Sequence, residues 1–225
     1  MTDLTIIYLT ANRLLDAWVE YHADVLRCAA GQHPIVAISR RPVEGFTANL
    51  LDDTPISYTN VYRQLLRGAR VAETEYVAMA EDDTLYPPGH YDAYRPEPDA
   101  VAYNENRWGL YTWTGVYSRR NRITNAVLIA PRAYLIDALE ERFSRCSEAM
   151  LERWAGEVGR PKLERGLGVT IRRSVLFQTD APVVQLAHPD GLESAARHRR
   201  KKLGHDPTDT LPYWGHSSEI LRHYA

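Results

Sequence analysis

The chain has 225 residues, of which 44% are hydrophobic and 25% are charged, and its formal net charge is −2. This composition excludes an intrinsically disordered or membrane-embedded protein, and the net charge gives no overall attraction to nucleic acid. Two cysteines, Cys28 and Cys146, are too few for a disulfide framework and lack the paired spacing of a zinc site.

The length fits one domain over residues 1–225. No run of about 18 apolar residues occurs, so no membrane-spanning segment is predicted. The first residues also lack the length and the cleavage signal of a secretory peptide. We therefore expect a cytoplasmic protein with no membrane partner.

The first forty residues predict a strand, a helix and a second strand. Residues 4–10 (LTIIYLT) form a β-branched run, and helical spacing follows as far as Gly31. Residues 34–39 (PIVAIS) are again apolar. This order is typical of a βαβ unit with two parallel strands.

A Pro- and Gly-containing loop is expected over residues 40–55. Helical spacing then covers residues 58–74, and residues 76–80 (YVAMA) read as a fully buried strand. Beyond residue 91, strands joined by short turns are expected over residues 100–120 and 122–130. Later elements are predicted as helices at 131–144 and 147–159 and as strands at 174–179 and 182–188. The fold class is therefore α/β, with a mixed, mostly parallel sheet flanked by helices.

Three acidic residues, Glu81, Asp82 and Asp83, directly follow the buried strand over 76–80. In open α/β sheets ligands bind beyond the carboxyl ends of the strands. Alternate side chains of an extended segment share a face, so Glu81 and Asp83 are expected to point the same way and Asp82 the other. Two carboxylates facing one cation suit Mg²⁺ or Mn²⁺. The alternative is a solvated turn with a helix-capping Asp.

The segments TIIYLTANR, PIVAIS and YTNVYRQLLRGARVAETEYVAMAEDD, taken together, resemble a GT-A-fold glycosyltransferase of the family-2 type. The resemblance covers residues 4–90. It implies a GT-A-like nucleotide-diphospho-sugar transferase fold, with a nucleotide-binding half at 1–90, an acceptor half at 91–190 and a basic C-terminal tail at 191–225. It also implies that the acidic motif, written here Glu-Asp-Asp, binds the Mn²⁺ or Mg²⁺ of a nucleotide-sugar.

The same resemblance implies a set of ligand-binding residues. Asp83, Glu81 and His188 are expected to bind the metal, although a His at a strand end is also a common polar terminus. Arg63 shares a helix face with Asn60 and is expected to bind a diphosphate, or else to be solvated. The expected nucleotide-sugar-binding residues are Thr10, Ala11, Asn12, Ser39, Arg40, Asn60, Arg63, Glu81 and Asp82.

The catalytic base has three candidates. Inverting relatives take the acceptor proton with an acid that opens a late helix. Glu148 occupies that position in SEAMLERWAGEVG, although it also favours a helix N-terminus electrostatically. Glu164 and Asp180 are the competing candidates.

The expected acceptor-binding residues are aromatic and basic. Trp108 and Trp113 belong to an aromatic-rich stretch on which sugars or bases stack, although burial in a strand pair explains them equally well. Arg199, Arg200, Lys201 and Lys202 form a basic run that binds donor or nucleic-acid phosphates, or is simply solvated.

The sequence thus predicts a metal-dependent glycosyltransferase that moves a sugar from a nucleotide-diphosphate donor to an acceptor hydroxyl. A hydroxylated base of bacteriophage DNA, such as a hydroxymethyl base, is one candidate acceptor, and the location would then be the host cytoplasm. One alternative is a nucleotidyltransferase on a related α/β fold, although LTANRLL has no glycine for a phosphate loop. The other is a non-enzymatic nucleic-acid-binding module, which leaves the acidic residues unexplained.

Overall fold

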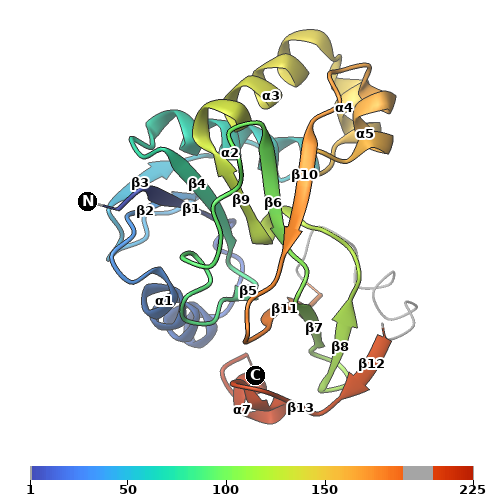
Figure 1. Cartoon of the computed structure of the whole chain (residues 1–225). Helices are drawn as coiled ribbons and strands as arrows, with labels where there is room; N and C mark the ends of the chain where they lie inside the picture. The colour runs from blue at the N-terminus through green and yellow to red at the C-terminus, as the bar shows by residue number, and fades with distance from the viewer. Residues whose placement is uncertain (1, 190–204, 225) are drawn as a thin grey trace.

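A seven-stranded sheet with the strand order β10-β6-β9-β4-β1-β2-β3 is the centre of the computed structural model, which describes residues 2–189 and 205–224 (Figure 1). Only β9 runs antiparallel to its neighbours, β4 and β6, so the sheet is mixed, as predicted. The strands are β1 (Leu4–Thr10), β2 (Ile35–Ser39), β3 (Ala48–Leu51), β4 (Tyr76–Glu81), β6 (Ala100–Asn104), β9 (Leu128–Pro131) and β10 (Arg173–Phe177).

Two strands of the sheet interior, β1 and β2, are buried along their whole length. Every residue of β1 and β2 is buried, and β1 pairs in parallel with both β2 and β4. Strands covered on both faces need continuous apolar runs, which is why their sequences show no alternation of polar and apolar residues. The parallel arrangement puts the carboxyl ends of β1, β2 and β4 at one edge of the sheet.

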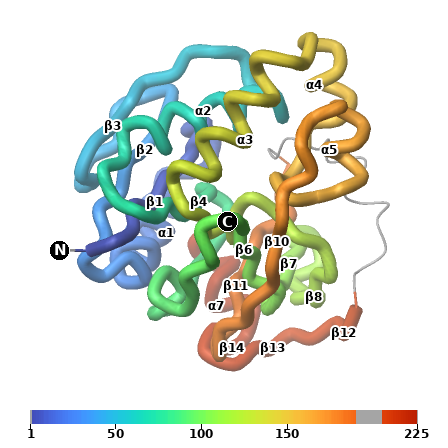
Figure 2. The backbone as a smooth tube through the Cα atoms, turned by 45° about the horizontal axis from the view of Figure 1, so that its top comes forward, coloured from blue at the N-terminus to red at the C-terminus, as the bar shows by residue number. Residues whose placement is uncertain are grey.

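Helices cover both faces of this sheet. Figures 1 and 2 show α1 (Asp16–Ala30) on one face, and α2 (Tyr58–Val71) with α3 (Arg132–Arg145) on the other. α1 ends at Gly31, whose φ of 56° lies in the left-handed region that glycine adopts at no steric cost. α2 begins after Ser57, whose hydroxyl accepts a hydrogen bond from the backbone N–H of Asn60.

A second sheet, which the sequence did not predict, has the strand order β12-β8-β7-β11-β5. The expected meander over residues 100–120 is divided between the two sheets: β6 joins the first, and the β7–β8 hairpin joins the second. The two-residue β5 is too short to give a sequence pattern. The strands are β5 (Thr84–Leu85), β7 (Arg107–Tyr111), β8 (Val116–Arg120), β11 (Val183–Ala187) and β12 (His205–Thr208).

The C-terminal segment packs against the second sheet and α1. It contains β13 (Thr210–Leu211), β14 (Gly215–His216) and α7 (Ser217–Leu221). Leu211, Trp214 and Ile220 are buried in one hydrophobic cluster with Trp18 of α1. The ring of His223 stacks on Tyr21 with centroids 4.0 Å apart, and the Tyr224 ring lies edge-on to Trp18 at 6.1 Å. Residues distant in sequence therefore meet around the first helix.

Three shorter elements also differ from the expectation. β3 lies inside the segment 40–55 that was expected to be a loop, because this half-exposed edge strand has no regular apolar alternation. The helix expected over 147–159 ends early as α4 (Glu148–Trp154), and α5 (Pro161–Leu167) follows with Pro161 in its first turn. A 3₁₀ turn, η1 (Asn125–Val127), precedes β9.

Within the described part of the chain, no helix combines the length and the apolar character needed to cross a bilayer.

Gly68 is a point of close packing between α2 and the central sheet. A Cβ at this position would lie 2.5 Å from Cγ2 of Ile7, which is fully buried in β1. We predict that Gly68→Ala is net destabilising, because an overpacking cost of about 1–3 kcal/mol exceeds a helix-propensity gain of at most about 1 kcal/mol. Chemical denaturation gives the unfolding free energy. A double-mutant cycle with Ile7→Ala should recover part of the loss, and strict additivity would contradict the packing explanation.

Candidate functional site

The three acidic residues form a turn that connects the two sheets. β4 ends at Glu81. The turn consists of Asp82 and Asp83, and β5 begins at Thr84. The amide nitrogen Nε2 of Gln185 lies 3.2 Å from Glu81 Oε2 and 3.3 Å from Asp83 Oδ1, whereas Asp82 Oδ2 accepts a 2.6 Å hydrogen bond from Thr10 Oγ1. Glu81 and Asp83 therefore share one side and Asp82 takes the other, as strand alternation predicted.

His188 lies beside the acidic turn although it is 105 residues further along the chain (188 − 83). Its Nε2 is 3.8 Å from Asp83 Oδ2. β11 pairs antiparallel with β5, and the backbone N–H of Leu186 donates a 2.8 Å hydrogen bond to the carbonyl of Asp83. The second sheet thus delivers His188 to the residue that the sequence paired with it as a metal ligand.

Side chains of α1 fix the backbone of the acidic turn. Trp18 Nε1 donates a 2.7 Å hydrogen bond to the carbonyl of Asp82. His22 Nε2 lies 3.0 Å from the carbonyl of Glu81 and 2.9 Å from that of Thr84. Because both partners are acceptors, His22 must carry its proton on Nε2. Burial lowers the pKa of His22 to about 4, so the ring is neutral near pH 7.

This contribution of α1 was missed in the sequence. Trp18 and His22 are four residues apart, so they lie on one face of the helix. Such spacing is also what an ordinary core-facing helix shows, and it says nothing about which segment the polar ring atoms reach.

The three carboxyl groups of the turn differ in the direction of their pKa shifts. Burial, followed by repulsion from Asp83 and Asp82, raises the pKa of Glu81 well above its usual value. Burial and the charge of Asp83 raise the pKa of Asp82 to about 6. Although burial also acts to raise the pKa of Asp83, its interaction with His188 and its hydrogen bonds from Thr84 and Gln185 hold it below the usual value. Asp83 is therefore the most stable anion of the three.

Gln185 was also missed, and Arg107 fixes its orientation. Arg107 Nη1 donates a 2.8 Å hydrogen bond to Gln185 Oε1, so the amide nitrogen must face Glu81 and Asp83. The one sequence signal is a polar residue inside the apolar run VVQLA of β11. Strand alternation alone does not say which face of the sheet this residue lies on. Arg107 itself is 6% exposed.

The predicted nucleotide-binding residues at the ends of β1 and β2 are connected by hydrogen bonds. Asn12, with a left-handed φ of 52°, follows Ala11 at the end of β1, and its backbone N–H donates to Thr10 Oγ1. The Asn12 side-chain oxygen accepts from the backbone N–H groups of Arg40 and Arg41 at 2.8 and 2.9 Å. Arg40 also donates to the carbonyl of Thr54. These contacts brace the edge of the sheet next to Asp82.

Two predicted donor-binding residues have internal roles instead. Ser39 is fully buried, and its hydroxyl donates to the carbonyl of Arg41 and accepts from Asn49. Asn60 is 6% exposed, and its amide donates to Asp52 Oδ2 at 3.0 Å. Because these polar atoms already serve the protein, direct contact of Ser39 or Asn60 with a ligand is not supported.

Arg63 and Glu148 were predicted to bind diphosphate and to act as the base, but they bind each other. Their guanidinium and carboxylate groups form an ion pair between α2 and α4, and the Arg63 guanidinium lies over the ring of Phe143 at 4.8 Å. Neither side chain forms a hydrogen bond or ion pair with the acidic turn. Arg63 lines an open groove between α2 and α3, whose other arginines are Arg67 and Arg70.

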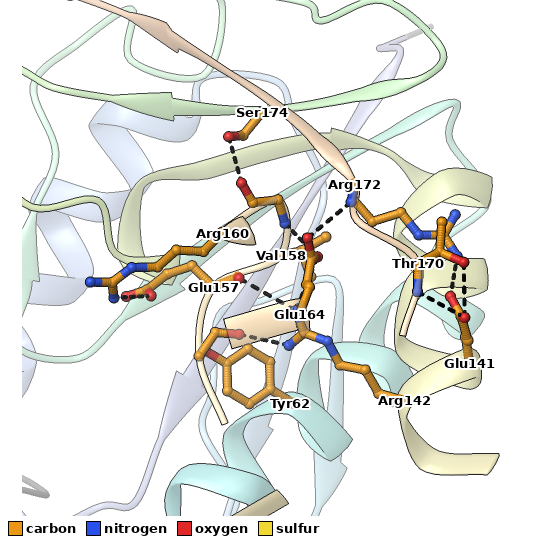
Figure 3. A network of polar contacts seen from close by, with 12 residues as sticks. Tyr62, Glu141, Arg142, Glu157, Val158, Arg160, Glu164, Thr170, Arg172 and Ser174 are labelled. Atoms are coloured by element: carbon orange, nitrogen blue, oxygen red, sulfur yellow. Dashed lines mark hydrogen bonds and ion pairs between the residues drawn. The ribbon is translucent and has the colours of Figure 1, made fainter. Parts of the chain in front are cut away.

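Glu164, the second predicted base, is a structural residue. Its side chain is 1% exposed and forms an ion pair with the buried Arg142 at 3.4 Å (Figure 3). Its carboxylate also accepts hydrogen bonds from the backbone N–H groups of Gly159 at 2.7 Å and Arg172 at 2.9 Å. With both oxygens used inside the protein, Glu164 cannot take a proton from an acceptor.

The other predicted residues lie apart from the acidic turn. Asp180 is exposed in the loop before β11 and makes no contact with Glu81, Asp82 or Asp83. Trp108 packs against the hydrophobic cluster of the second sheet, and Trp113 lies edge-on to Tyr111 at 5.3 Å, both half-buried. The basic residues Arg199, Arg200, Lys201 and Lys202 lie outside the described residues.

Glu157 is a further acidic residue near the turn that was not predicted. It precedes α5, pairs with Arg160 at 3.0 Å, and keeps a side-chain exposure of 16% (Figure 3). The negative charge of Glu157 contributes to raising the pKa of Glu81. It also acts to raise the pKa of Arg107, which burial lowers. Glu157 lies in the same segment, residues 147–159, as the predicted base Glu148. The sequence does not show which of the two is nearer the turn, because that depends on where α4 ends.

The donor set around Asp83 fits a divalent cation that has an incomplete protein shell. Glu81 and Asp83 supply hard oxygen donors on one side of the turn, and His188 supplies an imidazole nitrogen beside them. Among residues 2–189 and 205–224, no three His, Cys, Asp or Glu side chains are spaced to enclose an ion. Such a set suits a cation whose remaining ligands are water and a bound phosphate.

Comparison with known proteins gives the fold. No protein-family model matches the chain, and no curated protein matches it significantly. A superposition on the structure of S. aureus TarS gives a TM-score of 0.50 at 10% identity, covering 84% of this chain and 37% of that one. The mixed sheet flanked by helices is a GT-A- or nucleotidyltransferase-like fold, which confirms the predicted fold class.

Two further solved structures match over most of their length. A glycosyltransferase involved in the glycosylation of the major capsid of PBCV-1 is 11% identical, with a TM-score of 0.49 and coverage of 82% of this chain and 92% of that one. A nucleotidyl transferase from Methanothermobacter thermautotroptrophicus (Mth528) is 13% identical, with a TM-score of 0.47 and coverage of 89% and 96%.

The buried ion pair of Arg142 and Glu164 gives a direct test of the structural role of Glu164. We predict that Glu164→Gln lowers the unfolding free energy by about 3–5 kcal/mol, because it leaves the Arg142 charge buried without its counter-ion. Urea denaturation measures the change. The exposed Glu152 on the neighbouring α4 provides a control, and Glu152→Gln should alter stability by less than about 0.5 kcal/mol. An unchanged stability of Glu164→Gln would contradict the assignment.

Proposed function

We propose that the protein is a metal-dependent glycosyltransferase that moves a sugar from a nucleotide-diphosphate donor to an acceptor hydroxyl. The observation that carries this proposal is the approach of His188 to Asp83 beyond the carboxyl end of β4, with Glu81 and Asp83 held on one side of the turn by the Gln185 amide. Asp83 and His188 are 105 residues apart in the sequence (188 − 83), yet His188 Nε2 lies 3.8 Å from Asp83 Oδ2, which supports the proposal.

A bound Mn²⁺ or Mg²⁺ would neutralise charge that builds on the leaving diphosphate. Asp83 is the main expected ligand because its pKa is held below the usual value. Glu81, whose pKa is raised by burial and repulsion, would ionise as a cation approaches. Gln185 holds the two carboxylates in position, and Thr10 holds Asp82 away from them.

Glu157 is the proposed general base. Of the three candidates from the sequence, Glu148 is paired with Arg63 between α2 and α4, Glu164 is buried with both oxygens hydrogen-bonded, and Asp180 forms no hydrogen bond or ion pair with the turn. Glu157 is partly exposed in the segment between α4 and α5, its ion pair with Arg160 uses Oε2, and its negative charge acts on the pKa values of Glu81 and Arg107. A carboxylate in this position can accept the proton of an acceptor hydroxyl that approaches from the second sheet.

The proposed acceptor is a molecule with a free hydroxyl group. A hydroxylated base in phage DNA remains one acceptor to be tested, together with small alcohols and other polymers. A nucleotidyltransferase would use similar carboxylates, but it would release diphosphate from a nucleoside triphosphate. Product analysis separates the two reactions, because only sugar transfer or donor hydrolysis leaves a nucleoside diphosphate.

We predict that Asp83→Asn abolishes metal-dependent nucleotide binding, because the most stable anion of the site is lost. Isothermal calorimetry with a panel of nucleoside diphosphates, with and without Mn²⁺, measures the effect, and circular dichroism checks the fold. Asp24→Asn removes an equal charge from an exposed residue of α1 and should bind like the parent. If Asp83→Asn keeps the parental affinity and metal dependence, the metal assignment is wrong.

We predict that Glu157→Gln lowers kcat by about 10²–10⁴-fold and leaves Mn²⁺-dependent nucleoside diphosphate affinity within about twofold of the parent. The reason is that the base acts on the acceptor oxygen and does not hold the donor. Hydrolysis of nucleotide-sugars in the presence of Mn²⁺, with water as the acceptor, measures kcat. Glu152→Gln on α4 is the matched control. A parental kcat in Glu157→Gln would exclude Glu157 as the base.

A further inference from the structure

One face of the second sheet carries two arginines next to the acidic turn. Arg107 on β7 lies opposite Arg120 on β8, and Gly109 lies opposite both Ser118 and Gln185. Cross-strand partners and alternate residues of a strand point to the same side of a sheet. Arg107 and Arg120 are therefore on the side of Gln185, whose amide contacts Glu81 and Asp83.

The arginines of this hairpin lack an acidic partner in the described part of the chain. Within residues 2–189 and 205–224, no carboxylate lies within ion-pair distance of Arg107, Arg119, Arg120 or Arg122, all of which belong to the β7–β8 hairpin or its end. About half of the arginines elsewhere in the described residues are paired with acids, namely Arg27, Arg63, Arg70, Arg95, Arg142, Arg145, Arg160, Arg172 and Arg173.

The guanidinium of Arg120 has a defined position. It lies over the ring of Tyr111 at 4.9 Å and directly above Gly109, where a Cβ would be 2.5 Å from Arg120 Nε. Gly109 therefore provides the space in which the side chain lies flat between Tyr111 and Arg107. Arg120 remains half-buried, whereas its neighbour Arg119 is exposed and points to the opposite side with Trp108.

We propose that Arg120, with Arg107 behind it, binds a phosphate ester group of the acceptor. A planar guanidinium binds phosphate oxygens in a bidentate manner, and stacking on Tyr111 reduces the freedom that binding must remove. Arg120 belongs to the second sheet, and Gln185 lies between it and the carboxyl ends of β1 and β2. Arg120 is therefore on the acceptor side of the site. This assignment of an acceptor side rests on the proposed function.

An internal role for the two arginines makes different predictions. If Arg120 only offset the charge of Glu81, Asp82 and Asp83, its loss would lower thermal stability or change cation affinity and would leave phosphate binding unaltered. Arg107 is too buried for a clean test, since its replacement would disturb Gln185. Arg120 and Gly109 are the positions where the two roles can be separated.

The test measures the binding of glycerol 3-phosphate and of a short oligothymidylate by calorimetry, the first a small phosphate ester and the second a polymer. Arg120→Gln should weaken the binding of at least one probe by about tenfold or more, and Arg119→Gln by less than about twofold. Gly109→Ala displaces the guanidinium but keeps its charge, so it should reproduce most of the loss. Loss with oligothymidylate alone identifies a polymeric acceptor; loss with both identifies the phosphate ester itself.

Several results would overturn the proposal. These are equal losses in Arg119→Gln and Arg120→Gln, parental binding in Arg120→Gln, and no binding of either probe to the parent. A lower thermal midpoint with unchanged probe binding would assign Arg120 to the internal role. Nucleoside diphosphate binding with Mn²⁺ is measured in parallel on the parent. If only that binding is absent, the proposed function fails while the phosphate site stands.

Discussion

Repulsion among Glu81, Asp82 and Asp83 is the constraint on which the rest of the structure depends. Three neighbouring carboxyl groups in a partly buried turn are unfavourable unless donors are fixed around them. Thr10 at the end of β1, Thr84 in the turn itself and Gln185 on β11 supply those donors. The backbone of the turn is held separately by Trp18 and His22. The site is therefore assembled from two sheets and one helix, and no single element contains it.

The second sheet supplies side chains that offset the repulsion among these carboxyl groups. β5 is only two residues long, yet it gives β11 an edge to pair with, directly after the turn. That pairing sets Gln185 opposite Thr84 and brings His188 next to Asp83. β7 then pairs with the other edge of β11 and places Arg107 where it orients the Gln185 amide. Arg107, two strands away from β5, thus determines which way the Gln185 amide faces.

Much of the fold was readable in the sequence, because buried parallel strands and amphipathic helices leave strong local patterns. β1, β2, β4 and α2 were predicted within a few residues of their observed bounds, and so was the sharing of one side by Glu81 and Asp83. The pairing of Arg63 with Glu148 and the burial of Glu164 depend on how α2, α4 and α5 pack together. A single sequence carries no local signal of that packing.

The contacts of His223 and Tyr224 with α1 have a consequence for how the protein acquires its site during synthesis. Tyr21 and Trp18 belong to one of the first helices to leave the ribosome, whereas the rings that pack on them are more than two hundred residues further along (224 − 18 = 206). Trp18 also holds the carbonyl of Asp82. A nascent chain can form the βαβ unit early through local contacts, but the surroundings of the acidic turn are complete only after α7 and Tyr224 have emerged. Until then the carboxylates lack part of the packing that supports them.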